Sequence, residues 1–370
     1  MSKQVVSATT STSEASDCIA AGTPPTAVAR SKKFSTIALD LSYYCPLECD
    51  HCLFDAGPSR PLKGMADGHV MDIIKSAAEL ESFYTISIAN QEPFVQFERL
   101  SRLLEWLKAN FSGYGVSLTT TAMWAKSRDF TLDRLRRLKD LYLDALMISV
   151  DDFHQSQRQA PLERCIVCAQ VAQELGIPVT IQCIFTSTSH RLDYFRAQMA
   201  PHLQGDKIQW IESAVCPSGR ARKVIPESEW PQLTCMDGGC NAMEIMYVAP
   251  NGDATPCCGG GLVARGLVAG NLHKQSMAAI VSAVEQDPIM NSIAAHRGPA
   301  GLIKTLTEQH PSWRPRPHYT GACHACYEIM NDAGLVQFLR QSYETKKVDL
   351  LLTRLYMEVE HKLFVATDDT

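Results

Sequence analysis

The chain has 370 residues, of which 45% are hydrophobic and 20% charged, so it is longer than one average domain and can bury a large core. Its formal net charge of -5 argues against a broad basic field for nucleic acid or an anionic membrane, and no apolar run has the length of a membrane-spanning helix. Fourteen cysteines without an N-terminal secretory pattern indicate a reducing cytoplasm rather than a disulfide framework.

Residues 1–33 are rich in Ser, Thr and Ala and lack a sustained apolar period, which predicts a flexible tail. From Phe34 onward, short β-branched runs alternate with amphipathic stretches. The predicted strands are 36–42, 84–89, 115–120, 145–150, 179–185 and 208–211. The predicted helices are 67–81, 97–110, 131–140, 161–175 and 191–200. This alternation predicts an α/β fold with a mainly parallel sheet of six units, and periodicity alone leaves both a barrel and a doubly wound sheet open.

After the last of these strands, the segment 216–221, Cys-Pro-Ser-Gly-Arg-Ala, begins a loop-rich stretch. Turn residues at 250–253 then predict a hairpin spanning 242–256. Helices are expected near 274–286 and 331–363. The boundaries that follow are a large domain at 34–215, a linker at 216–239, a smaller domain at 240–330 and C-terminal helices at 331–370.

Three cysteines, Cys45, Cys49 and Cys52, lie within eight residues just after the first predicted strand. Such short loops let three thiolates reach three corners of one iron–sulfur cluster and leave the fourth iron without a protein ligand. An open iron can bind a small chelating molecule. Zinc is the alternative, but it normally takes four ligands and fits a trio poorly unless His51 or a distant cysteine completes the set.

A second concentration of cysteines follows the predicted barrel, namely Cys235, Cys240, Cys257, Cys258, Cys323 and Cys326. The turn residue Gly252 lets the hairpin fold back so that Cys240 and Cys257 flank one metal centre. On spacing we favour Cys240 over Cys235 and Cys257 over Cys258, with Cys323 and Cys326 completing four thiolates. Structural zinc is the alternative for this group, because both metals use a Cys-x2-Cys pair.

Other positions are predicted to pack rather than to react. Cys165 and Cys168 lie in a helix-like stretch and Cys183 in a strand, whereas the role of Cys216 is open. The apolar residues of the last helix, expected to pack against the core, are Leu350, Leu351, Leu355 and Met357.

The Cys-x3-Cys-x2-Cys spacing, with His51 before the last cysteine, resembles the radical S-adenosylmethionine (SAM) superfamily. The second group resembles the auxiliary-cluster SPASM domain and its shortened twitch relative. The resemblance implies a partial (β/α)6 barrel followed by a small α+β domain. It also implies SAM, a [4Fe–4S] cluster whose open iron chelates SAM, and one auxiliary [4Fe–4S] cluster. In that family the reduced cluster cleaves SAM to a 5′-deoxyadenosyl radical that removes hydrogen from an unactivated carbon.

The same resemblance suggests residues that hold SAM. The chain has Asn90-Gln91-Glu92-Pro93 where the family usually has Gly-Gly-Glu-Pro, so Glu92 is expected to accept a hydrogen bond from the SAM ammonium. The other residues expected at the cofactor are His51, Ser149 and Gln182.

Asp151, Asp152 and His154 follow the fourth predicted strand, at the edge where barrel enzymes gather functional groups, and are the candidate catalytic residues. The alternative for Asp152 and His154 is that they cap a helix or satisfy a loop.

We therefore predict a cytoplasmic radical SAM enzyme that abstracts hydrogen from a peptide or a small natural product. Ribosomal peptide maturation ranks nearly equal with a dehydrogenase resembling the aminocyclitol dehydrogenases. A fully ligated auxiliary cluster would make the net reaction oxidative, and an open one would anchor substrate. The expected partners are the substrate and an electron donor such as flavodoxin or ferredoxin, without nucleic acid or membrane. A zinc-stabilised binding protein without catalysis is the alternative from another class.

Overall fold

The computed structural model describes residues 34–89, 91–156, 161–204, 208–233, 236, 240, 243–353, 355–356 and 359. The predicted tail at 1–33, together with Asn90, Cys235 and Met357, lies outside these residues.

The six predicted strands and five predicted helices of the large domain are confirmed. The strands are β1 (Thr36–Leu39), β2 (Thr85–Ile88), β3 (Gly115–Thr120), β4 (Leu143–Ser149), β5 (Val179–Phe185) and β6 (Ile208–Ala214). The helices are α1 (Asp67–Ala78), α2 (Phe97–Asn110), α3 (Arg128–Lys139), α5 (Leu162–Glu174) and α6 (Leu192–Met199), with a short α4 (Asp152–Gln155) after β4.

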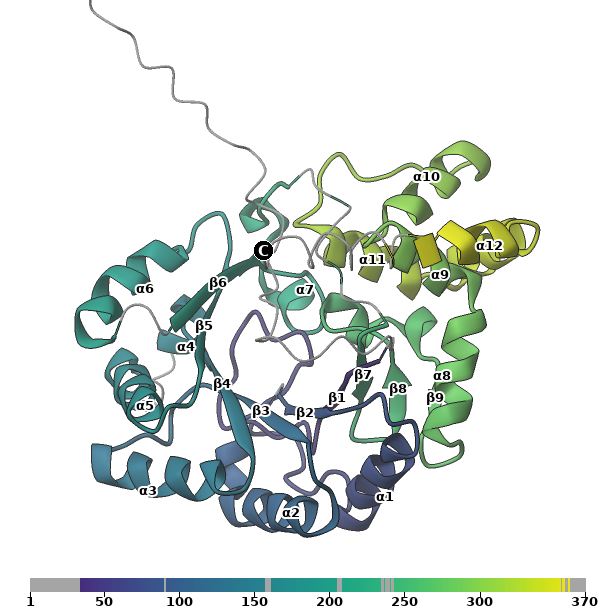
Figure 1. Ribbon diagram of the computed structural model, residues 1–370. Coiled ribbons are helices and arrows are strands. Elements are labelled where there is room, and N and C mark those ends of the chain that lie inside the picture. The colour runs from purple at the N-terminus through teal and green to yellow at the C-terminus, as the bar shows by residue number, and fades with distance from the viewer. Residues whose placement is uncertain are drawn as a thin grey trace, which may run out of the picture.

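Strands β1 to β6 are parallel and lie side by side in chain order. A doubly wound sheet reverses its strand order at a switch point, and this sheet does not. Figure 1 shows the strands as an arc with α1, α2, α3, α5 and α6 on its outer side. The large domain is therefore a partial (β/α)6 barrel.

The two faces of the arc differ because side chains alternate along each strand. On the helix-covered face, Ile86, Leu118 and Ile148 are buried in the main core. The alternate positions, such as Ser149 and Gln182, are only half-buried. The concave face is thus lined partly by small and polar side chains, and the carboxyl ends of the parallel strands share one edge of the arc.

A second unit continues the same sheet. Strand β7 (Ile245–Val248) pairs in parallel with β1, and β8 (Asp253–Thr255) and β9 (Gly270–Asn271) follow antiparallel. The predicted hairpin is confirmed, and Gly252 in its turn has a φ of +85°. Sequence patterns did not predict that the hairpin would cover the free edge of β1, where unpaired backbone groups are available for pairing.

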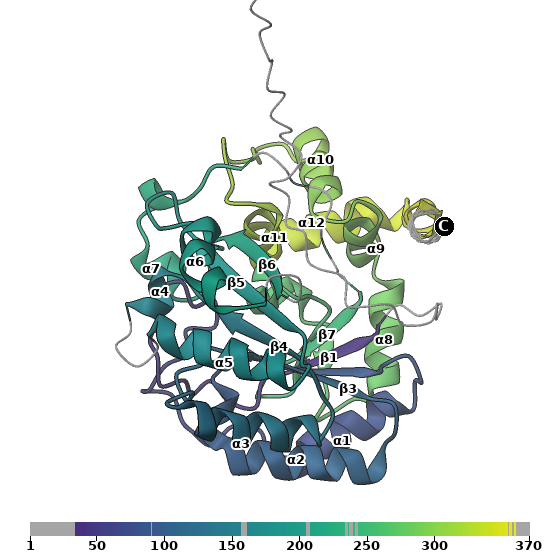
Figure 2. The ribbon, with the colours of Figure 1, turned by 60° about the vertical axis from the view of Figure 1, so that its left-hand side comes forward.

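Helices dominate the C-terminal part. They are α7 (Ala221–Val224), α8 (Met277–Gln286), α9 (Pro288–Ala295), α10 (Ala300–Gln309), α11 (Ala322–Asn331) and α12 (Ala333–Glu344). Helices α9, α10 and α11 were not predicted, although Asp287 before Pro288 is a recognisable start signal: its side chain accepts hydrogen bonds from the amides of Ile289 and Met290. Figure 2 shows α9, α10, α11 and α12 gathered at the end of the molecule away from α1, α2 and α3.

The helical stretch predicted near 331–363 is confirmed in part, and some of its residues lie outside those that the structure describes. Helix α12 ends at Glu344, and a turn at 345–346 precedes a further helical stretch. Leu350 packs against the main core, but Leu355 is 40% exposed, so the expected packing extends only part of the way. Apolar spacing is the same for a packed and an unpacked helix face, and therefore does not distinguish them.

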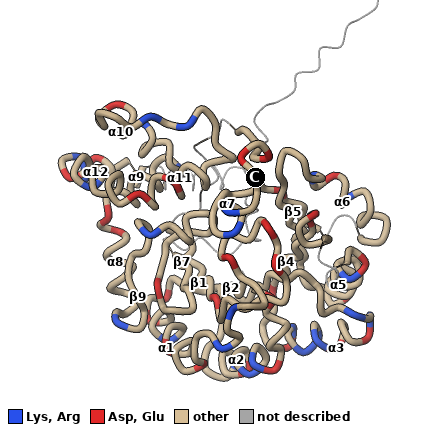
Figure 3. The backbone as a smooth tube through the Cα atoms, turned by 180° about the vertical axis from the view of Figure 1, so that it is seen from behind, with Lys and Arg blue, Asp and Glu red and all other residues tan. Residues whose placement is uncertain are grey.

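Charged side chains of both signs are interspersed along the outer elements (Figure 3), in agreement with the small net charge. Within the residues described, no helix is both long enough and apolar enough to cross a bilayer.

Candidate metal and cofactor site

The first cysteine loop follows β1 and is closed at its base by backbone hydrogen bonds. The amide of Cys45 donates to the carbonyl of Gly57 (3.3 Å), and the amide of Cys52 donates to the carbonyl of Cys49 (3.1 Å). Burial, with smaller contributions from the charges of Cys49 and Cys52, raises the pKa of Cys45 to about 12. Burial also raises the pKa of Cys52, so these neighbouring thiols ionise poorly unless a cation neutralises them, and the donor set fits a metal cluster.

Arg220 fastens this loop from 171 residues away in sequence. Its guanidinium donates to the carbonyls of Cys49 (2.9 Å) and Ala56 (2.6 Å), and its backbone amide donates to the carbonyl of Cys52 (3.0 Å). The side chain is only 8% exposed. The 216–221 segment is recognisable in the sequence, whereas this long-range contact is not.

Asp55 neutralises that buried cation together with two others. Its carboxylate lies 3.2 Å from Nε of Arg220, 2.7 Å from Nζ of Lys223 and 2.9 Å from Nη2 of Arg60. The hydrogen bond from Lys223 is the largest cause that lowers the pKa of Asp55. The cysteine loop therefore rests on a network of charge-assisted hydrogen bonds.

His51, Asp151 and His154 form a buried cluster beside the loop. Nδ1 of His154 lies 2.8 Å from Oδ1 of Asp151, and Nε2 of His51 lies 4.0 Å from Oδ2. Burial lowers the pKa of His51 to about 4, so its imidazole is neutral at physiological pH. Burial alone raises the pKa of Asp151, but the imidazoles of His154 and His51 lower it to about 2. The Nδ1 atom of His51 is buried without a hydrogen-bond partner, which fits a bound cofactor that supplies one.

The three candidate catalytic residues are separated. Asp151 and His154 belong to the cluster just described, and Asp151 also caps α4 by accepting from the backbone amide of His154 (2.9 Å). Asp152 instead pairs with His190, whose Nδ1 lies 2.9 Å from its carboxylate. Proximity to the cysteine loop favours Asp151 and His154 over Asp152, and their catalytic role stays a prediction.

Glu92 is 3% exposed, and its carboxylate accepts hydrogen bonds from other residues of this chain. Its oxygens accept from Oγ1 of Thr120 (2.9 Å), from Oγ1 of Thr121 (2.6 Å) and from the amide of Thr121 (2.9 Å). Neighbouring Gln91 likewise accepts from the amide and hydroxyl of Ser42 (2.8 and 3.0 Å). The contact of Glu92 with SAM stays a prediction; the structure shows it ordering the end of β3.

Ser149 and Gln182 are register partners on β4 and β5. Register partners on adjacent strands point to the same face, and both side chains are half-buried on the concave face of the arc. The structure therefore brings these two expected cofactor residues together. Their contact with SAM stays a prediction.

The second cysteine group gathers from separate elements. Cys257 follows β8, Cys323 and Cys326 lie on one face of the first turn of α11, and Cys240 precedes β7. Burial raises the pKa of both Cys257 and Cys326, and the charges of neighbouring cysteines raise it further. A Cβ atom on Gly259 would lie 2.7 Å from Sγ of Cys323, and one on Gly261 would lie 2.8 Å from Sγ of Cys257. Glycines thus leave room around the sulfurs, and the set fits an iron–sulfur cluster.

The remaining cysteines differ in their exposure and in their neighbours. Cys258 is exposed, which favours its neighbour Cys257 as the ligand. Cys165, Cys168 and Cys183 are fully buried in the main core, as predicted. Cys216, left open by the sequence, lies beside Cys323.

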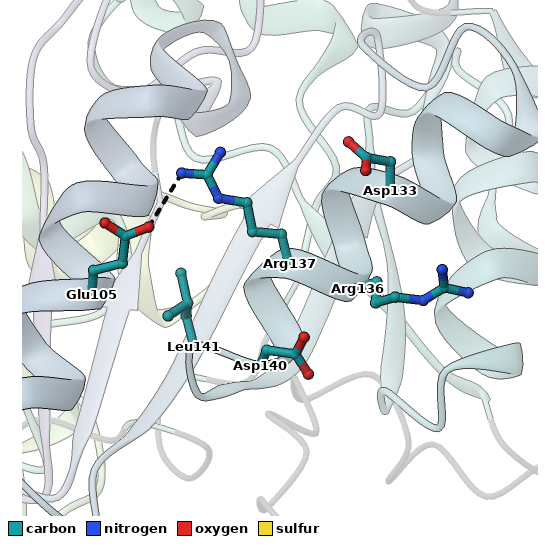
Figure 4. A pocket seen from close by; sticks show the side chains of 6 residues that line it. All are labelled: Glu105, Asp133, Arg136, Arg137, Asp140 and Leu141. Carbon is teal, nitrogen blue, oxygen red and sulfur yellow. Dashed lines mark hydrogen bonds and ion pairs between the residues drawn. The ribbon is translucent and has the colours of Figure 1, made fainter.

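A surface cavity of about 280 Å³ lies elsewhere. Figure 4 shows its lining of Glu105, Asp133, Arg136, Arg137, Asp140 and Leu141, where α3 leads into β4. This is the amino-terminal edge of the sheet, opposite the edge that carries the cysteine loop. Its residues form surface ion pairs, such as Arg137 with Glu105, and belong to no cluster of cysteines.

Comparison with known families agrees with this geometry. Residues 39–188 match the radical SAM superfamily, and residues 240–327 match the iron–sulfur cluster-binding SPASM domain. The chain belongs to the radical SAM superfamily and carries a C-terminal SPASM domain. Its cofactors are accordingly SAM and iron–sulfur clusters of the [4Fe–4S] type.

Individual relatives are more distant. "Putative peptide biosynthesis protein YydG" of Bacillus subtilis (strain 168) is 24% identical over 119 residues, and the match spans about a third of each chain, 32% of this one and 36% of the relative. The crystal structure of BtrN in complex with AdoMet and 2-DOIA is 14% identical, with a TM-score of 0.38, covering 67% of this chain and 82% of that one. Native anSMEcpe with bound AdoMet and Cp18Cys peptide is 15% identical, with a TM-score of 0.44, covering 66% and 80%.

Proposed function

We propose that this chain is a radical SAM oxidoreductase that modifies a ribosomally made peptide in a reducing cytoplasm. The observation that carries the proposal is the three-cysteine loop at the carboxyl edge of the parallel strands, combined with a second cysteine group in the SPASM unit. The choice of a peptide is supported by a relative named for peptide biosynthesis.

Each set of residues has a role in this scheme. Cys45, Cys49 and Cys52 hold the first cluster, and the cysteines of the SPASM unit hold the auxiliary one. His51 presents its unpartnered Nδ1 atom to SAM, while Ser149 and Gln182 contact it from β4 and β5. Glu92, which accepts a hydrogen bond from the amide of Thr121, would accept a further one from the SAM ammonium.

When bound, these groups supply a 5′-deoxyadenosyl radical that takes a hydrogen atom from a substrate carbon, and an acceptor for the electron that the substrate radical then gives up. The chain itself orients the reactants and shields them from water. We assign the barrel to 34–215, the linker to 216–239, the auxiliary unit to 240–330 and the C-terminal helices to 331–370. Flavodoxin or ferredoxin is the expected source of the first electron.

Isotope transfer tests the proposal. Short peptides encoded beside the gene are made with fully deuterated amino acids and incubated anaerobically with the reconstituted protein, SAM and a reductant. We expect 5′-deoxyadenosine that carries deuterium and a peptide whose mass has changed. Hydrogen abstraction predicts both, because the abstracted atom ends on the 5′ carbon.

Two serine variants supply the control. Cys49→Ser is expected to abolish deuterium transfer, whereas Cys165→Ser, at a fully buried cysteine outside both groups, is expected to retain it. If none of the peptides is altered but a cyclitol or sugar labels the 5′-deoxyadenosine, the peptide assignment is wrong and the small-molecule dehydrogenase is correct.

A further inference from the structure

Five cysteines, and not only the four expected from spacing, meet in the SPASM unit. Cys216 leaves the end of β6 and reaches the group of Cys240, Cys257, Cys323 and Cys326. A [4Fe–4S] cluster has four corners, so among the described residues one thiol exceeds the number needed.

The glycine run at 259–261 shows how closely Cys216 is placed. A Cβ on Gly260 would lie 2.2 Å from Sγ of Cys216 and 3.3 Å from the carbonyl oxygen of Cys323. Its neighbours Gly259 and Gly261 face the sulfurs of Cys323 and Cys257 in the same way. Three successive glycines thus leave space for three sulfur atoms, and one of these is Sγ of Cys216.

The backbone around Cys216 is fixed on both sides. Before it, the amide of Val215 donates to the carbonyl of Phe185 on β5 (2.9 Å). After it, the amide of Ser218 donates to the carbonyl of Cys216 (2.7 Å), and Arg220 is anchored to the first cysteine loop. The thiol is therefore held at the group by the fold.

We propose that Cys216 is a ligand of the auxiliary iron–sulfur cluster, on a corner next to Cys323. With five thiols for four corners, protein sulfur closes every iron, so this cluster carries electrons and does not anchor substrate. The segment 216–220 then joins the two metal sites. It begins with Cys216, a ligand of the auxiliary cluster, and ends with Arg220, which holds the loop of the first cluster.

The test isolates the auxiliary cluster in the full-length chain. Cys45, Cys49 and Cys52 are all changed to Ala, so that iron content and the reduced electron paramagnetic resonance (EPR) spectrum report one cluster of about four irons. In this background the five thiols are changed to Ser one at a time, and Cys165→Ser serves as the matched control.

We expect four of the five variants to lose iron or shift their g values, with Cys216→Ser among the four, and the control to match the parent. If Cys216→Ser superimposes on the parent in both iron content and spectrum, the proposal is wrong. Cys216→Ala, which introduces no polar group, gives a second reading should the serine variant fold poorly. The experiment needs no peptide, so its outcome is independent of the proposed function.

Discussion

Asp151 accepts hydrogen bonds from the backbone amide of His154 (2.9 Å), from Nδ1 of the same residue (2.8 Å) and from the amide of Ile184 (3.3 Å). This fully buried carboxylate fixes the His154 ring; although burial lowers it, the charges of Asp151 and Cys49 hold the pKa of His154 well above its usual value. The imidazole therefore acts electrostatically on Cys49, one of the three proposed cluster ligands.

Loss of that ring should change the cluster's potential. A cationic imidazole near a cluster stabilises the more negative, reduced state, so we expect His154→Leu to make the midpoint potential of the first cluster more negative. Redox titration followed by EPR measures it. His190→Leu removes the imidazole paired with Asp152 and should leave the potential unchanged; equal potentials in the two variants would contradict the assignment.

At the scale of elements, the 216–221 segment packs against the first cysteine loop. Gly219 has a φ of +55°, and a Cβ there would lie 2.1 Å from the carbonyl oxygen of Leu53 in the cysteine loop. Only glycine lets the two backbones approach so closely while holding this left-handed conformation. The segment can fasten the loop because its backbone, and not only Arg220, fits against it.

Gly219→Ala should therefore separate the segment from the loop. The left-handed conformation alone costs about 1–3 kcal/mol, and the steric overlap adds to this, so we expect a lower melting temperature and less iron in the first cluster. Gly68→Ala is the matched control, because α1 leaves open space there and alanine favours a helix. Iron retention equal to that of the control would show that the segment does not hold the loop.

At the scale of the whole molecule, β1 is the barrel strand to which the auxiliary unit is joined. It pairs with β2 on one side and with β7 on the other, so one continuous sheet carries both cysteine groups. The unit matched as SPASM is thus built onto the edge of the barrel, and removing it exposes that edge.

A chain ending at residue 233 should aggregate, because the edge of β1 loses its partner and the buried side chains Ile37 and Leu39 lose cover. Size-exclusion chromatography measures this. A chain ending at residue 344, after α12, keeps the whole sheet and is expected to remain monodisperse. A monomeric, soluble shorter chain would show that the barrel folds independently.

Local sequence patterns suffice to predict the elements of the barrel and the first cysteine loop. Strands and helices of the barrel follow from periodicity, which reports the face that each short segment buries. The three-cysteine loop is recognisable because its ligands are neighbours in the chain. Helices α9, α10 and α11 were missed because they have only eight to ten residues, and only α9 begins with a side-chain cap.

The sequence by itself determined the alternation of elements, the two metal-binding groups and hence the family. Only the tertiary structure decided that Arg220 fastens the first cysteine loop, that β7 pairs with β1 and that Cys216 joins the second group. The reason is physical: spacing along a chain encodes geometry within a few turns, whereas contacts between distant segments depend on how the whole sheet and its helices pack.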